Sequence, residues 1–186
     1  IIIILIGILV WFFMKSDKND EKVTLERISW NEIKQVLKLP SVWLLMVIIL
    51  CGYVGYKITD IISQYAEEVM LYNQVESAKV GTLLQFLRPA TGILVGLIAD
   101  KLKITWLLFV SFVLTLIGGV LFASGVIAPT TTLLFFMSVV VIAAGVYAIR
   151  ALYFGVMQVG KIPMTLTGTA VGLISLIGYT PDVFAG

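Results

Sequence analysis

The stretch ITWLLFVSFVLTLIGGVLFAS, residues 104–124, decides the class of structure because it contains no ionisable side chain. As an α-helix it rises about 1.5 Å per residue and therefore crosses a hydrocarbon layer of roughly 30 Å. The rest of the chain agrees, since 60% of its 186 residues are hydrophobic and only 13% are charged. Soluble domains carry about 25% charged residues. The composition excludes a soluble globular domain, and a net charge of only +2 gives no basic face for nucleic acid.

Further hydrophobic segments lie on both sides of this stretch. Four of them are long enough to span a bilayer as helices, at residues 41–65, 79–99, 132–154 and 166–186. The uncharged run 1–14 reaches only about 21 Å as a helix, so we expect it to be the second half of another span. A secretory signal is the alternative for this run, but no basic residue precedes it. With no initiator Met and an apolar end, we expect the chain to be part of a longer protein.

The distribution of Lys and Arg predicts which ends of the spans face the cytoplasm. The connections 15–40, 100–103 and 155–165 carry nine basic residues: Lys15, Lys18, Lys22, Arg27, Lys34, Lys38, Lys101, Lys103 and Lys161. The opposite connections carry only Lys79. Because cytoplasmic loops are rich in Lys and Arg, these three connections are predicted to be cytoplasmic. We therefore expect a multi-pass protein of the plasma or inner membrane.

The long connection 15–40 contains a predicted amphipathic helix. Ser29 and Glu32 match the S-x-x-E capping box, which predicts a helix beginning at Trp30. Four apolar side chains then share one side of the helix: Trp30, Ile33, Val36 and Leu37. Such a stripe favours a linker helix lying at the membrane surface, and a regulatory binding site is the alternative.

The segment 41–65 carries polar residues on one helical face. Tyr53, Lys57, Asp60 and Gln64 recur at i, i+4, i+7 and i+11, and Tyr56 lies beside them. Ionisable residues within a span usually face protein or water, so this face is a candidate solute site. The alternative is an i, i+3 ion pair between Lys57 and Asp60 that merely orients the helix.

Arg88, at the middle of the segment 79–99, is the strongest site candidate. Gln85 lies on the same helical face, and Pro89 removes a backbone hydrogen bond beside it. Because arginine keeps its proton, its charge must be paired, hydrated or available to an anion. A buried ion pair, with Asp60 or with another part of the protein, is the structural alternative.

The last two segments contain further polar or small residues. Arg150 lies near the predicted cytoplasmic end of its span, where a membrane-surface anchor is the favoured role. Asp182 follows a proline near the predicted outer surface, which favours a solvated carboxylate. Small residues that favour close helix packing recur in the last segment at Gly168, Gly172, Ser175 and Gly178.

The cytoplasmic turn GLIADKLK, residues 96–103, resembles the G-x-x-x-D-[RK] loop that lies between helices 8 and 9 of the major facilitator superfamily. The turn also falls two spans after a long cytoplasmic linker, as it does in that family. Gly96 would permit close helix approach, Asp100 could accept hydrogen bonds from a facing helix N-terminus, and Lys101 would lie at the headgroups. The resemblance implies that Gly96, Asp100 and Lys101 form a gating motif.

The resemblance implies an all-α, polytopic membrane helix bundle that is the C-terminal six-helix half of a major facilitator fold. Residues 1–14 would end helix 6, residues 15–40 would form the cytoplasmic linker, and residues 41–186 would form helices 7 to 11, with helix 12 absent. The chain would thus hold about five full spans and part of a first. The stretches 150–154, 161–163 and 167–172 also resemble the sugar-phosphate and organic-anion permease branch. Helix 9, residues 104–124, would face lipid.

These observations favour a secondary active transporter of a small polar, anionic solute that works by alternating access between two halves. The predicted site contains two positive charges, Lys57 and Arg88, and one negative charge, Asp60, so it is net positive. The predicted solute-binding residues are Arg88, Lys57, Tyr53, Tyr56, Gln85 and Gln64. Asp60 is the predicted coupling carboxylate. The expected partners are the solute, a coupling ion, the bilayer and an N-terminal half of the same transporter.

Two other functional classes were weighed against transport. A non-transporting membrane sensor or scaffold that signals through the linker helix is the alternative. An integral-membrane enzyme has no support, because the chain has no His and shows no nucleophile–base pair or metal-ligand cluster. We expect no cofactor and no metal site.

Overall fold

The computed structural model describes residues 29–153, 155–156, 160 and 162–184, and the regular secondary structure of these residues consists of helices alone. In chain order the elements are α2 (Trp30–Leu37), α3 (Pro40–Asp60), α4 (Ile62–Glu68), α5 (Gln74–Ala99), α6 (Ile104–Ala123), α7 (Thr132–Leu152), the 3-10 turn η1 (Met164–Leu166), α9 (Thr167–Gly178) and α10 (Pro181–Phe184). The predicted helix at 1–14 lies outside the described residues, as do the linker up to residue 28 and Lys161.

Four helices are long and apolar enough to cross a membrane: α3 continued by α4, then α5, α6 and α7. They match four of the predicted spans. The helix α5 starts earlier than the hydrophobic segment, because Asn73 caps it. The Asn73 side chain accepts a hydrogen bond of 2.9 Å from the Glu76 backbone N–H, and the Glu76 carboxylate accepts one of 3.3 Å from the Asn73 backbone N–H. This capping box stabilises a polar first turn that hydropathy alone does not indicate.

The last predicted span, residues 166–186, is not one continuous helix in the structure. The helix α9 has 12 residues and so extends only about 18 Å, too short to cross a bilayer. It ends at Gly178, and a separate short helix begins at Pro181. Proline has no N–H to donate to the carbonyl four residues earlier, so the helix is interrupted within an apolar stretch.

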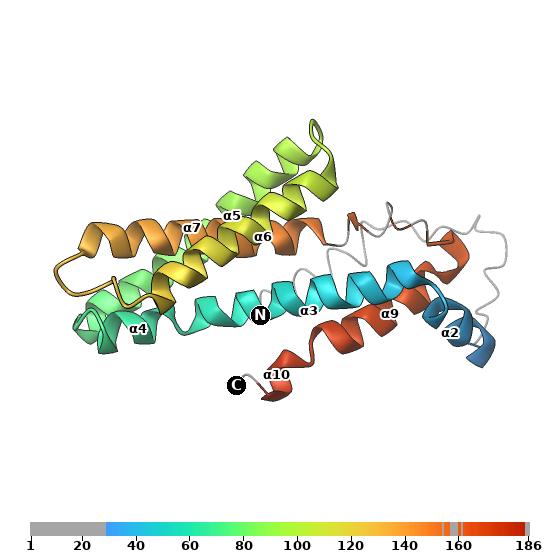
Figure 1. Cartoon of the computed structure of the whole chain (residues 1–186), viewed down its shortest axis with the longest axis horizontal. Coiled ribbons are helices and arrows are strands. Elements are labelled where there is room, and N and C mark those ends of the chain that lie inside the picture. Colours follow the sequence, from blue (N-terminus) through green and yellow to red (C-terminus); the bar gives the residue numbers. More distant parts are fainter. Residues whose placement is uncertain (1–28, 154, 157–159, 161, 185–186) are drawn as a thin grey trace, which may run out of the picture.

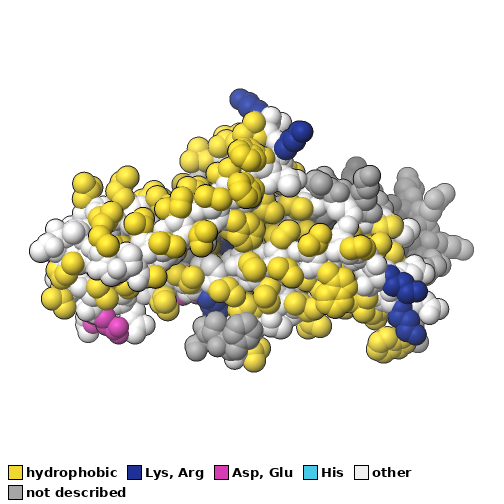
Figure 2. Space-filling model, viewed as in Figure 1, with side chains coloured by type: hydrophobic (Ala, Val, Ile, Leu, Met, Phe, Trp, Pro, Cys, Tyr) yellow, Lys and Arg dark blue, Asp and Glu magenta, His cyan; other side chains and the backbone are white. Residues whose placement is uncertain are grey.

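The helices α3 and α7 run along the length of the molecule, whereas α5 and α6 slant away from them toward their connecting turn (Figure 1). The helix α7 packs against α3, α5 and α6, and α3 also packs against α9. Figure 2 shows hydrophobic side chains over most of one face, and Lys and Arg side chains over the α5–α6 turn and beside α2. The helix α6 carries exposed Trp106, Phe109 and Leu116, and its lipid-facing position stays a prediction.

The linker helix α2 begins at Trp30, as the sequence predicts, but its cap differs in detail. The Ser29 hydroxyl accepts its hydrogen bond from the Asn31 backbone N–H at 3.3 Å and not from that of Glu32. The apolar stripe is also divided: Val36 is fully buried in a cluster with α3 and α9, whereas Trp30 is 77% exposed. The Val36 part of the stripe therefore packs against α3 and α9 of the same chain.

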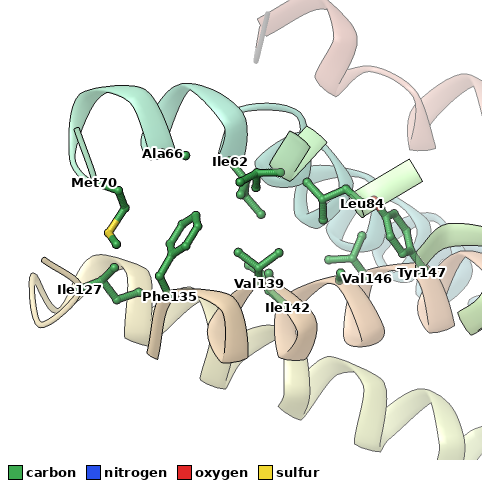
Figure 3. Packing of buried hydrophobic residues seen from close by; sticks show 12 residues of the cluster. Ile62, Ala66, Met70, Leu84, Ile127, Phe135, Val139, Ile142, Val146 and Tyr147 are labelled. Carbon is green, nitrogen blue, oxygen red and sulfur yellow. The ribbon is translucent and has the colours of Figure 1, made fainter. Parts of the chain in front are cut away.

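The second hydrophobic cluster lies between α4 and the first half of α7 (Figure 3). Phe135 is fully buried there, and its ring stacks on Tyr65 with a centroid distance of 6.3 Å. Leu84 and Tyr147 belong to the same cluster. It therefore anchors α5 on α7 close to the polar residues described below.

Close approach of α3 and α7 occurs at Gly52. A Cβ atom on Gly52 would lie 2.6 Å from Cγ2 of Ile149, so glycine is needed at this contact. In the last segment, a Cβ on Gly178 would likewise lie 2.4 Å from Cγ2 of Ile49. Gly168 and Gly172 have no atom within 4 Å of such a position. Among the residues that the structure describes, the glycines of the stripe thus make a close helix contact only at Gly178.

Candidate functional site

Two arginines and two tyrosines from three helices meet between α3, α5 and α7. Arg88 of α5 donates a hydrogen bond from Nη2 to Oη of Tyr56 in α3. Its guanidinium carbon lies 4.7 Å from the Tyr56 ring centroid and 5.7 Å from that of Tyr147 in α7. The guanidinium carbon of Arg150, also in α7, lies 4.2 Å from the Tyr56 ring centroid. We call these four residues the Arg–Tyr cluster.

A cavity of about 420 Å³ lies beside the Arg–Tyr cluster. It brings together four of the residues singled out in the sequence: Tyr56 and Asp60 from α3, and Gln85 and Arg88 from α5. Its other polar lining residues are Thr59, Ser63, Thr82 and Tyr147. The α5 helix continues through Pro89, so the Gln85 carbonyl lacks the usual helical N–H donor four residues later. The cavity is therefore rich in hydrogen-bonding groups.

A second cavity, of about 290 Å³, shares Arg88 and Tyr147 with the first. Its remaining lining residues are Gly92, Arg150 and Ala151. Two guanidinium groups thus border this cavity, and its lining includes no carboxylate among the residues that the structure describes.

The charges of Arg88 and Arg150 have no carboxylate partner in the described part of the chain. No Asp or Glu oxygen there lies within 4.0 Å of either guanidinium. The expected alternative of an Arg88–Asp60 ion pair is therefore not formed, although both residues line the larger cavity. Contact with the Tyr56 ring stabilises each cation by cation–π attraction, which offsets only part of the loss of hydration.

Lys57 and Tyr53 both contact the carboxylate of Asp182 and not Arg88, although the Tyr53 ring centroid lies 5.8 Å from that of Tyr56. Nζ of Lys57 lies 2.8 Å from Oδ1 of Asp182, and Oη of Tyr53 donates a hydrogen bond of 2.7 Å to Oδ2 of the same carboxylate. The i, i+3 spacing suggested that Lys57 pairs with Asp60. In the structure Lys57 pairs instead with Asp182 of α10. Asp182 was expected to be a solvated carboxylate near the outer surface. In the structure it pairs with Lys57, which lies near the middle of Pro40–Glu68.

Gln64, also predicted to bind solute, lies outside both cavities. It is exposed on α4, and its Nε2 donates a hydrogen bond of 2.8 Å to Oε1 of Glu68. The break between α3 and α4 at Ile61 separates it from Tyr56 and Asp60.

The residues of the gating motif lie at the end of α5. Asp100 is the C-cap of that helix, and Gly96, Asp100 and Lys101 are all exposed. A Cβ atom on Gly96 would meet nothing within 4 Å, so the expected close helix approach is absent among the described residues. The motif is therefore accessible to a part of the protein outside them.

Sequence reasoning missed the role of Arg150 and Tyr147 in this cluster. The two are spaced i, i+3 on one side of α7, which was a usable signal. Arg150 was instead assigned to the membrane surface from its position along the helix.

The fold and this arrangement define a multi-pass membrane protein with a cationic cavity between its spans. The sequence model of the Major Facilitator Superfamily matches residues 1–185, so the chain belongs to this family. The chain is similar to Inner membrane protein YqcE of Escherichia coli (strain K12), with 26% identity over 194 residues that cover 99% of the chain and 45% of that protein. It thus spans less than half the length of this relative. No solved structure gives a significant match.

Family membership confirms the resemblance seen in the turn 96–103, the all-α membrane bundle and the multi-pass membrane location. The gating motif, the assignment to the organic-anion permease branch and the roles of individual residues stay predictions.

Proposed function

We propose that the chain forms the C-terminal half of a secondary active transporter that moves a small polar anion by alternating access. The observation that carries this proposal is the position of Arg88. It lies near the middle of the span Gln74–Ala99, borders both cavities and has no carboxylate within 4.0 Å among the described residues.

The chemistry of the guanidinium group favours an anion as the missing partner. Arginine presents five N–H donors, and the hydrogen bond to Tyr56 uses one of them. A carboxylate or phosphate group can accept two parallel hydrogen bonds from the remaining donors, which makes arginine well suited to bind either. An anion entering the cavity would also compensate a charge that is costly within a membrane span.

In the same proposal, Asp60 is the carboxylate that couples proton movement to transport. It lines the larger cavity together with Arg88 and forms no ion pair within the described residues. A carboxylate in this position can take up a proton on one side of the membrane and release it on the other. Exchange of one anion for another would need no such proton, so the two coupling modes differ in their dependence on Asp60.

The test uses the full-length transporter that contains this chain, reconstituted in liposomes. Uptake of labelled inorganic phosphate and of succinate would be measured for the wild type, Arg88→Gln and Arg88→Lys. Lys103→Gln is the matched control, because it removes an exposed positive charge from the α5–α6 turn. Loss of a charge-assisted interaction predicts a decrease of about tenfold to a hundredfold for Arg88→Gln.

The lysine variant should recover little of this activity, since it retains the charge but lacks the planar fork. Normal uptake by Arg88→Gln would refute the proposed site. A wild-type protein that takes up neither anion, although it is correctly inserted, would contradict anion transport and favour the sensor or scaffold alternative.

A further inference from the structure

We propose that Arg150 is a second cationic ligand of the same site, and that Arg88 and Arg150 together select a solute carrying two negative charges. This inference rests on the proposed function, because it specifies the charge of the transported anion. It assigns a binding role to a residue whose place in the sequence suggested only a membrane-surface anchor.

The common contact with Tyr56 places the two arginines close together. Their guanidinium carbons lie 4.7 Å and 4.2 Å from the same ring centroid, so they are no farther apart than the sum of these distances. Both residues line the cavity of about 290 Å³. A small dianion, such as a short dicarboxylate or a phosphate, can therefore reach both groups at once.

Packing of α7 against α3 holds Arg150 in this position. Ile149, the preceding residue, is fully buried and packs closely against Gly52 of α3. Gly55, which precedes Tyr56, lies against Val146 in the same interface: a Cβ atom there would be 3.4 Å from Cγ2 of Val146. These two contacts, Gly52–Ile149 and Gly55–Val146, therefore define the rotation of α7 next to the Tyr56–Arg150 contact.

The local charge balance points to a divalent rather than a monovalent anion. Two guanidinium groups that share one neutral ring repel each other, and the lining of their common cavity includes no carboxylate among the described residues. The faces of Tyr56 and Tyr147 carry only partial negative charge and relieve the repulsion in part. Asp60 lines the adjoining larger cavity but lies more than 4.0 Å from both guanidinium groups. An anion with one charge would therefore leave one guanidinium without an anionic contact, whereas an anion with two charges could contact both.

The neighbouring residues make room for such a ligand. Gly92 and Ala151, which complete the lining of the smaller cavity, have minimal side chains. A Cβ atom on Gly92 would meet nothing within 4 Å. The space next to the two arginines is thus open, and no other described side chain fills it.

The experiment compares two ligands that are matched in size and differ by one charge. Succinate carries two negative charges at neutral pH and succinamate carries one. Their dissociation constants would be measured by isothermal titration calorimetry with the purified full-length transporter, and inorganic phosphate would test a dianion whose charges share one centre. The variants are Arg150→Gln and Arg150→Lys, with Lys103→Gln as the exposed-charge control.

We expect the wild type and Lys103→Gln to prefer succinate over succinamate by about tenfold or more, the effect of one charge-assisted contact. Arg150→Gln should bind succinate and phosphate at least about tenfold more weakly while its affinity for succinamate changes little. Arg150→Lys should retain most of the preference because it retains the charge. Size-exclusion chromatography of each variant verifies that it is folded, and Arg150→Lys provides the comparison if Arg150→Gln is not.

Several outcomes would overturn the inference. An unchanged preference for succinate in Arg150→Gln would leave the anion site in place but remove Arg150 from it. If a folded Arg150→Gln variant lost affinity for succinate and for succinamate equally, Arg150 would have a structural role instead. If the wild type binds none of the three anions, the proposed function itself fails and the inference fails with it.

Discussion

Replacement of Gly118 by alanine should separate α6 from α7. A Cβ atom at Gly118 would lie 2.6 Å from Cβ, 2.9 Å from Cα and 3.0 Å from the backbone N of Ile142. Two of these atoms belong to the α7 backbone, so no side-chain rotation can remove the clash. The helices must move apart at the interface that holds α7, and with it Tyr147 and Arg150, in place.

The adjacent Gly119 provides the matched control, because a Cβ there would meet nothing within 4 Å. Overpacking a close contact costs about 1–3 kcal/mol, whereas replacing glycine by alanine in a helix gains about 1 kcal/mol. The helix-propensity gain is common to both substitutions. The difference in the free energy of unfolding between Gly118→Ala and Gly119→Ala should therefore equal the overpacking cost alone, about 1–3 kcal/mol.

The assay is unfolding of the full-length transporter by dodecyl sulfate in mixed micelles, followed by far-ultraviolet circular dichroism. Gly118→Ala should unfold at a lower detergent fraction than Gly119→Ala, which in turn should unfold at a fraction equal to or higher than that of the wild type. Equal midpoints for the two variants would refute the packing of α6 on α7 described above.

Three further substitutions test the charged residues outside the Arg–Tyr cluster. Lys57→Met should lower the thermal midpoint by leaving Asp182 without its partner, and Asp182→Asn in the same chain should restore it; a double variant no more stable than Lys57→Met would disprove the pairing. Asp60→Asn should weaken proton-driven uptake more than anion exchange in liposomes, and an equal loss of both would remove its coupling role. Asp100→Asn should shift the distribution of spin-label distances between the cytoplasmic ends of the two halves without changing solute affinity, and unchanged distances would exclude a gate.

Helical periodicity was sufficient to find much of the candidate site. Spacing at three and four residues placed Tyr56 beside the polar face of its span, and it placed Gln85 with Arg88 on one face of the next. Together with Asp60 these residues line a single cavity in the structure. The reason is that ionisable and polar groups on a span avoid lipid, so the polar faces of neighbouring spans turn toward each other.

The partner of Lys57 could not be predicted in the same way. The spacing offered Asp60, three residues away, whereas the carboxylate that binds Lys57 and Tyr53 belongs to Asp182, which is 129 residues from Tyr53. Finding it required knowing that the last hydrophobic segment is interrupted after Gly178 and that α10 packs against α3. Hydropathy reports that a segment is apolar, but it does not report the depth that each of its residues reaches.

Arg150 illustrates why depth along one helix is a poor guide to function. Near the end of its span, an arginine can extend toward the headgroups or back along a neighbouring helix, and both directions suit its long side chain. The choice is made by the register between α3 and α7, which the Gly52–Ile149 contact sets. Tyr56 lies four residues beyond Gly52, about 6 Å along the helix axis, which is within reach of the side chain that follows Ile149. The Arg150 guanidinium therefore contacts the Tyr56 ring near the middle of the span and does not extend to the membrane surface. Gly52, which permits the close packing of α3 and α7, thereby also places a second positive charge at the cavity.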